Sequence, residues 1–150
     1  MPEHLESEYR SFISERWEKR LDECHGECVL RCTELAKIVG DSLLHFDGDR
    51  YTMGDFVVMP NHVHLLVSFP GEDQLKSQCR SWKKYSATEI NKRLNRRGEF
   101  WQVESFDHLI RSPEAFDGYR RYIARNPLWA NLSQGEYLYY RAPHCGPVTP

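Results

Sequence analysis

The stretch VVMPNHVHLLVSF, residues 57–69, constrains the fold more than any other part of this sequence. It is apolar at nearly every position, so it is expected to be a buried strand, whose side chains alternate between two faces. His62 and His64 therefore point to one face, whereas Val63 and its alternate neighbours point to the other. Two imidazoles on a buried face are more often satisfied core histidines, but neutral imidazole also binds Mn, Zn or Fe, and Mg when oxygens complete the site. A third ligand elsewhere in the chain is needed to decide between these interpretations.

Helices and strands alternate along the rest of the chain. Apolar spacing and local propensity predict helices over residues 5–22, 33–45, 73–94 and 113–126, and strands over residues 56–59, 63–68 and 106–110. The last helix should begin after Ser112, an N-cap followed by proline, and stop at Asn126 because Pro127 disfavours helical geometry in the residue before it. Helices between few, mostly non-consecutive strands favour an α+β sandwich, with helices packed on one sheet.

The length of 150 residues suits one domain. We expect that domain over residues 1–142, with an acidic helical part over residues 1–42 and a loose tail over residues 143–150. No apolar run approaches the roughly 18 residues that cross a membrane, and the N-terminus has no apolar signal region. The expected compartment is the cytoplasm, with no membrane partner.

The net charge of −2 conceals an uneven distribution. Residues 1–55 hold thirteen acidic and seven basic side chains, a net charge of −6, whereas residues 76–125 hold twelve basic and six acidic ones, a net charge of +6. Such a split predicts either an anionic partner for the second half or simply a solvated helix face.

Five cysteines are present, three of them spaced C-x3-C-x3-C at Cys24, Cys28 and Cys32. This spacing differs from the C-x2-C pairs of zinc sites, and Cys79 and Cys145 do not form a second pair. We therefore expect ordinary thiols rather than a metal or redox centre.

The last predicted helix carries two polar residues that matter for the histidine pair. Tyr122 and Asn126 are four residues apart and so lie on one helical face, next to Arg125. Tyr119 belongs to a neighbouring stripe that is better explained by packing. Taken alone, Asn126 could equally be a C-terminal cap.

The phrases MPNHVHLL and YIARNPLWANL together resemble those of the single-tyrosine HUH transposases, and most closely the REP-associated tyrosine transposases among the relatives of insertion-sequence-200-like elements. HUH denotes histidine, a bulky hydrophobic residue and histidine, here residues 62–64. The second phrase has the family form Y-I-x-x-N-P, here residues 122–127, followed by Leu132. The resemblance extends from about residue 43 to residue 132.

The resemblance implies a ferredoxin-like sandwich, an antiparallel sheet with helices packed on it. Family members open with an apolar strand, and since none is evident in residues 1–42, the first strand is expected to be missing or replaced. His62, His64 and Asn126 would hold Mg2+ or Mn2+, and Tyr122 would attack a phosphate of single-stranded DNA. The product would be a 5′-phosphotyrosine link and a free 3′-hydroxyl, formed at hairpins with a short unpaired flank. Such a protein would be nucleoid-associated, and the family includes both homodimers and apparent monomers.

Contacts to DNA are expected from the basic side of the helix over residues 73–94 and from the last helix. The predicted DNA-binding residues are Lys76, Arg80, Lys83, Lys84, Arg120, Arg121 and Arg125. Tyr85 and Trp101 are candidates for stacking on bases, whereas Trp82 fits core packing better. The alternation around Asp107 and His108 leaves open which of the two faces the site.

Two other functions fit parts of the pattern. A domesticated or decayed domain would bind hairpin DNA without cutting it, and an unrelated metal-dependent hydrolase would use H-x-H without needing Tyr122.

Overall fold

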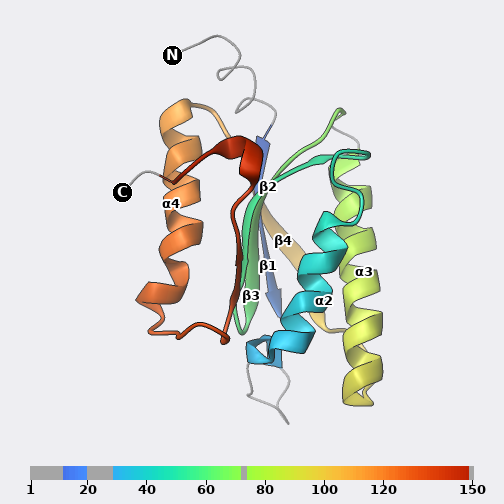
Figure 1. Cartoon of the computed structure of the whole chain (residues 1–150). Coiled ribbons are helices and arrows are strands. Elements are labelled where there is room, and N and C mark those ends of the chain that lie inside the picture. The colour runs from blue at the N-terminus through green and yellow to red at the C-terminus, as the bar shows by residue number, and fades with distance from the viewer. Residues whose placement is uncertain (1–11, 20–28, 72–73, 149–150) are drawn as a thin grey trace.

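The computed structural model describes residues 12–19, 29–71 and 74–148. Its five strands form one sheet in the order β4-β1-β3-β2-β5, and every neighbouring pair is antiparallel. The strands are β1 (Phe12–Lys19), β2 (Thr52–Val58), β3 (His62–Ser68), β4 (Trp101–Leu109) and β5 (Leu138–Tyr140). The helices are α2 (Thr33–Leu44), α3 (Gln74–Leu94) and α4 (Pro113–Trp129), with short 3-10 turns η1 (Val29–Arg31) and η2 (Pro143–Cys145). In Figure 1, α4 lies on one side of the sheet, and α2 and α3 lie on the other.

Strand β3 lies at the centre of the sheet, and its side chains separate two cores. Val63, Leu65 and Val67 pack into the larger apolar cluster with residues of α2 and α3. Leu66, on the opposite face, packs with Ile123 of α4. The alternation predicted from the sequence is confirmed, so both histidines of β3 are on the α4 face.

The prediction of a helix over residues 5–22 and of a missing first strand is wrong for the part of it that the structure describes. Residues Phe12–Lys19 form β1, which pairs with β3 on one side and β4 on the other. Trp17 of β1 is fully buried against the α3 side. With β1 present, the connections through α2 and α3 give the ferredoxin-like order, so the predicted fold class is confirmed.

Helix α4 begins as predicted, because the Ser112 hydroxyl accepts a hydrogen bond of 3.0 Å from the backbone N–H of Ala115. Its predicted end at Asn126 is wrong, since the helix continues through Pro127 to Trp129. Asn126 and Pro127 are both buried, and packing of this last turn outweighs the single backbone hydrogen bond that the proline cannot donate. The extension adds two exposed residues, Leu128 and Trp129, beyond the buried Pro127.

The helices predicted over residues 33–45 and 73–94 and the strand predicted over residues 63–68 agree closely with the structure. Strands β2 and β4 begin at Thr52 and Trp101, four and five residues before their predicted starts, and β5 was not predicted. Within the described part of the chain, no helix is long and apolar enough to span a membrane.

Candidate active site

The two histidines of β3 are buried, and each has one ring nitrogen in a hydrogen bond. Nδ1 of His62 lies 2.8 Å from Oδ1 of Asn61, and Nε2 of His64 lies 2.7 Å from Oγ of Ser14. Because an amide oxygen can only accept, His62 Nδ1 donates, and the neutral ring carries its lone pair on Nε2. The second nitrogens, His62 Nε2 and His64 Nδ1, are buried and make no hydrogen bond to the residues that the structure describes.

Both imidazoles are held in the neutral state. Burial lowers the pKa of His62 to about 4, and the positive charge of Arg16 contributes to the shift. Burial likewise lowers the pKa of His64 to about 4, with smaller contributions from Arg16 and neighbouring histidines. At neutral pH each ring therefore offers a lone pair, as a cation ligand requires.

Tyr122 of α4 lies against one histidine of this pair. Its ring centroid is 5.3 Å from that of His64, and the residue is 36% exposed. Arg16 Nη1 lies 3.5 Å from the Tyr122 Oη, and Arg16 Nε donates a 2.7 Å hydrogen bond to Glu18. The phenol that the sequence predicts to be a nucleophile thus lies beside a fixed guanidinium.

These residues surround a cavity of about 430 Å³ on the α4 face of the sheet. Its lining is Ser14, Arg16, Glu18, His64, Phe106, His108, Tyr119 and Tyr122. The cavity has room for a phosphate and part of a nucleotide, in contact with both the phenol and one of the two histidines.

Asn126 lies one helical turn beyond Tyr122 and is buried, and its Nδ2 makes no hydrogen bond among the described residues. A half-turn of the amide would present Oδ1 instead, the atom that a divalent cation prefers. His62, His64 and Asn126 therefore each have a buried polar atom without a hydrogen bond among the described residues, and their role as cation ligands stays a prediction. No cluster of three His, Cys, Asp or Glu side chains suited to a metal occurs in residues 12–19, 29–71 or 74–148. A cation site made only of protein groups would therefore need the Asn126 amide in addition to the two histidines.

Strand β1 contributes site residues that the sequence analysis missed. Ser14, Arg16 and Glu18 all line the cavity, and Arg16 and Glu18 pair in register with His64 and His62. The alternation S-x-R-x-E over residues 14–18 was the available signal, since it places three polar groups on one face of a strand.

Side chains of β4 continue the rows formed by β3 and β1, and they show which of Asp107 and His108 faces the site. Phe106 pairs with Arg16 and His108 with Ser14, and both line the cavity with Tyr122. Asp107 lines a second cavity together with Glu15, on the other face of the sheet.

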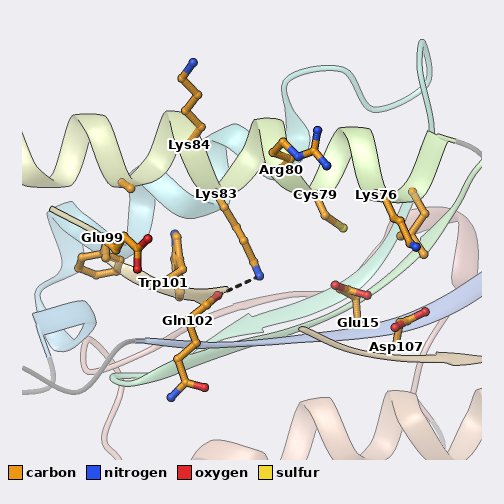
Figure 2. A pocket seen from close by; sticks show the side chains of 13 residues that line it. Glu15, Lys76, Cys79, Arg80, Lys83, Lys84, Glu99, Trp101, Gln102 and Asp107 are labelled. Carbon is orange, nitrogen blue, oxygen red and sulfur yellow. Dashed lines mark hydrogen bonds between the residues drawn. The ribbon is translucent and has the colours of Figure 1, made fainter. Parts of the chain in front are cut away.

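The second cavity, of about 540 Å³, lies between α3 and the strands β1 and β4. All four predicted DNA-binding residues of α3 line it: Lys76, Arg80, Lys83 and Lys84. In Figure 2, Lys83 reaches down from α3 and donates a 3.4 Å hydrogen bond to the Gln102 carbonyl, whereas Lys84 points away from the sheet. Burial lowers the pKa of Lys83, although the Glu15 carboxylate opposes the shift. These four residues are therefore together, but on the face opposite to Tyr122.

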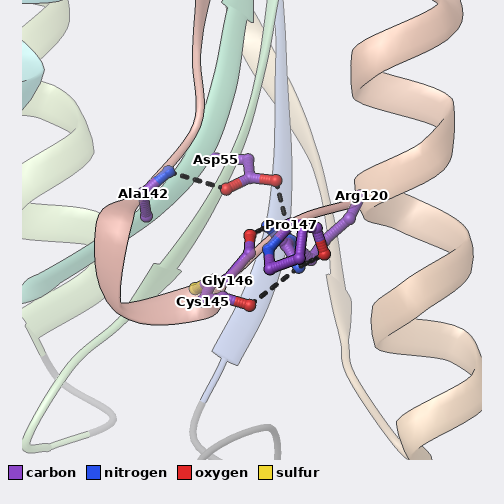
Figure 3. A network of polar contacts seen from close by, with 6 residues as sticks. All are labelled: Asp55, Arg120, Ala142, Cys145, Gly146 and Pro147. Atoms are coloured by element: carbon purple, nitrogen blue, oxygen red, sulfur yellow. Dashed lines mark hydrogen bonds and ion pairs between the residues drawn. The ribbon is translucent and has the colours of Figure 1, made fainter. Parts of the chain in front are cut away.

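The three arginines predicted on α4 differ from one another. Arg125 is exposed and Arg121 half-buried on the helix that carries Tyr122. Arg120 is buried, and its Nε donates a 2.8 Å hydrogen bond to Asp55 within an ion pair. Its remaining nitrogens bond to the carbonyls of residues 145–147, while the other Asp55 oxygen accepts from the Ala142 N–H (Figure 3). The structure therefore does not support the predicted DNA contact from Arg120. The hydrogen bonds from Arg120 to residues 145–147 also hold part of the predicted loose tail against the domain.

The aromatic residues also differ from expectation. Trp82 is buried in the larger core, as predicted. Trp101 is buried there too, so its predicted role in stacking on bases is wrong. Tyr85 is exposed on α3. The exposed aromatic rings next to Tyr122 are instead Phe106 and Trp129.

The cysteines show no shared site among the described residues. Cys32 and Cys79 are free thiols, and burial raises the pKa of the Cys79 thiol. Cys24 and Cys28 lie outside the described residues.

Comparison with known proteins identifies the family and the fold. A Haemophilus influenzae protein assigned to the REP-associated tyrosine transposases is 28% identical over 87 residues, which are 47% of this chain and 46% of that protein. The chain thus matches about half the length of this relative. A solved structure of a REP-associated tyrosine transposase bound to a REP hairpin superposes with a TM-score of 0.67, covering 84% of this chain and 72% of the other at 20% identity, and so shares its fold. The family model described as "Transposase IS200 like" matches residues 33–126, from α2 to the asparagine beside the tyrosine, and the chain belongs to this family.

Proposed function

We propose that this protein is a metal-dependent single-stranded DNA endonuclease and strand transferase that forms a 5′-phosphotyrosine intermediate at hairpin-containing DNA. The observation that carries the proposal is the contact between Tyr122 and His64, one of two buried neutral histidines with a ring nitrogen to spare. Family membership supports a tyrosine transposase, and the hairpin bound by the solved relative supports the substrate class.

The residues that would hold Mg2+ or Mn2+ are His62, His64 and Asn126, helped by oxygens of the DNA phosphate. Their buried, unpartnered polar atoms fit this role. A bound cation would stabilise the charge on the phosphate and orient it for in-line attack. Ser14 and Asn61 would fix the orientation of the two imidazoles, as hydrogen bonds behind metal ligands generally do.

In the proposed reaction the Tyr122 oxygen attacks the phosphorus of a DNA phosphodiester. The Tyr122 hydroxyl gives up its proton to solvent, a bond forms between its oxygen and the phosphorus, the bond from phosphorus to the 3′-oxygen breaks, and the 3′-oxygen takes up a proton from solvent. A phenol is normally protonated at neutral pH, so negative charge developing on its oxygen needs stabilisation. Arg16, 3.5 Å from that oxygen and held by Glu18, is placed to supply it in both attack and rejoining.

The DNA path follows from the two basic regions. Arg121 and Arg125 would bind backbone phosphates next to Tyr122, and the residues around the second cavity would contact DNA on the other face.

A missing first strand would favour a decayed domain. Because β1 is present, this argument for a decayed domain does not apply.

The test uses single-stranded hairpins with a short unpaired flank, taken from the genomic neighbourhood and labelled at either the 5′ or the 3′ end. With Mn2+ or Mg2+, the 3′-labelled strand should move to a protein-linked band on a denaturing gel, while the 5′-labelled strand should give a short free product. A chelator or Tyr122→Phe should abolish both.

Tyr119→Phe is the matched control, because its ring also lies against His64, with centroids 6.0 Å apart, and it should still form the adduct. Tight hairpin binding without any adduct would indicate a non-cutting domain. Cutting that survives Tyr122→Phe would refute the mechanism.

A further inference from the structure

Two exposed aromatic side chains lie beside the proposed nucleophile. Trp129, in the last turn of α4, is 61% exposed, and its ring centroid lies 5.5 Å from that of Tyr122. Phe106 of β4 is 54% exposed and lines the same cavity as Tyr122. Neither ring belongs to either apolar core, so core packing does not account for them.

The placement of Trp129 depends on the unexpected last turn of α4. It is seven residues after Tyr122, two helical turns, and therefore on the same side of the helix. Had the helix stopped before Pro127, this position would belong to a separate loop. The ordered turn instead keeps a large aromatic face next to the phenol.

The surroundings indicate what would cover these rings. Arg125, one turn before Trp129, is exposed, and Arg16 lies in the cavity beside Phe106 in the sheet. Aromatic faces interleaved with cations match single-stranded nucleic acid, whose bases stack on the rings while its phosphates meet the cations. A purely apolar partner would leave these guanidinium groups desolvated at a cost.

We infer that Trp129 and Phe106 form a base-stacking subsite for the unpaired nucleotides next to the phosphate that Tyr122 attacks. The inference rests on the proposed function and adds to it the residues that position the single strand. Because every base has an aromatic face, this subsite holds the strand in place without reading its sequence.

The four tryptophans make the inference directly measurable. Trp17, Trp82 and Trp101 are at most 5% exposed, so Trp129 is the one that DNA can reach. The full-length protein is titrated, with chelator present to prevent cutting, against a hairpin with an unpaired flank and against the same hairpin without it. The flanked hairpin should quench the tryptophan emission, and the blunt hairpin should not.

Variants separate stacking from general binding. Trp129→Phe should remove the quenching but keep most of the affinity, because phenylalanine still stacks. Trp129→Ala should weaken binding of the flanked hairpin by roughly 5- to 100-fold, the range given by loss of one stacked base. Phe106→Ala should have a similar effect, whereas Leu128→Ala, which removes equally exposed apolar surface from the same turn, should change neither affinity nor quenching.

The outcomes are distinct. If the flanked hairpin binds and is cut with unchanged emission, and Trp129→Ala binds it like wild type, the inference fails while the proposed function stands. If no hairpin binds, both fail. If sedimentation shows that Trp129→Ala turns a dimer into a monomer, a second copy covers these rings and the inference is overturned.

Discussion

Replacing Arg120 with methionine should destabilise the whole domain rather than weaken DNA binding specifically. Arg120 and Asp55 are 4% and 0% exposed, and their ion pair joins α4 to β2. Arg120 also bonds to three backbone carbonyls between Cys145 and Pro147, at 2.6–3.3 Å. Methionine would fill similar space but would leave the Asp55 carboxylate buried without its cation.

The magnitude follows from this geometry. Removing one partner of a buried ion pair costs about 3–5 kcal/mol. Because about 1 kcal/mol shifts the Tm of a domain of this size by roughly 2–4 °C, Arg120→Met should lower Tm by roughly 6–20 °C. Asp55→Asn should cost a similar amount, about 3–5 kcal/mol, because it leaves the buried Arg120 cation without its anion and turns an amide NH2 toward either Arg120 Nε or the Ala142 N–H. The double variant should cost less than the sum, because it leaves no buried carboxylate.

The assay is urea and thermal unfolding followed by circular dichroism, together with hairpin affinity measured where each variant is folded. Arg125→Met is the matched control, since Arg125 is exposed on the same helix. It should lose affinity without losing stability. The reasoning is refuted if Arg120→Met unfolds like wild type but loses hairpin affinity as Arg125→Met does, because Arg120 would then contact DNA directly.

Two further predictions concern the site. With chelator present, the free energy of unfolding should fall as the pH drops from about 6.5 to about 4, by up to about 3 kcal/mol for each of His62 and His64. In this pH range the imidazoles of the unfolded chain bind protons, whereas those of the folded chain, with pKa values near 4, do not. Urea unfolding at a series of pH values measures the effect, and a free energy of unfolding that does not change with pH would contradict the prediction. Arg16→Ala should slow formation of the Tyr122 adduct by about 10- to 100-fold with little change in hairpin affinity, as measured by single-turnover gels. An unchanged rate would remove Arg16 from the mechanism.

The central strand and the start of α4 could be predicted because their local patterns agree with their surroundings. The run around His62 is buried on both faces, as a central strand between two helical layers must be, and most of its side chains are apolar. Ser112 and Pro113 supply a helix start that depends on nothing beyond the next three residues.

Strand β1 could not be predicted in the same way because function changes its composition. Its α4 face carries Ser14, Arg16 and Glu18, which line the site, and its other face buries Glu15 beside the second cavity. Apolar side chains at these positions would have revealed a strand, but the polar side chains there made the segment resemble an acidic helix. Pairing with β3 and β4 overrides that local preference, as tertiary context commonly does in sheets.

The basic residues in the second half of the sequence are likewise divided between the two faces of the sheet. Seven of the twelve basic residues in the +6 segment are the predicted DNA-binding residues: four line the cavity on the α3 face, two lie on α4 near Tyr122, and Arg120 is buried in its ion pair. Strand β4, at the edge of the sheet, contributes to both cavities, with Phe106 and His108 on one face and Asp107 on the other. In the proposed binding mode, a DNA molecule that contacted both basic regions across this edge would have its paired and unpaired parts on different faces. Each face would then contact only a few phosphates, so local positive charge would suffice for binding despite the overall net charge of −2.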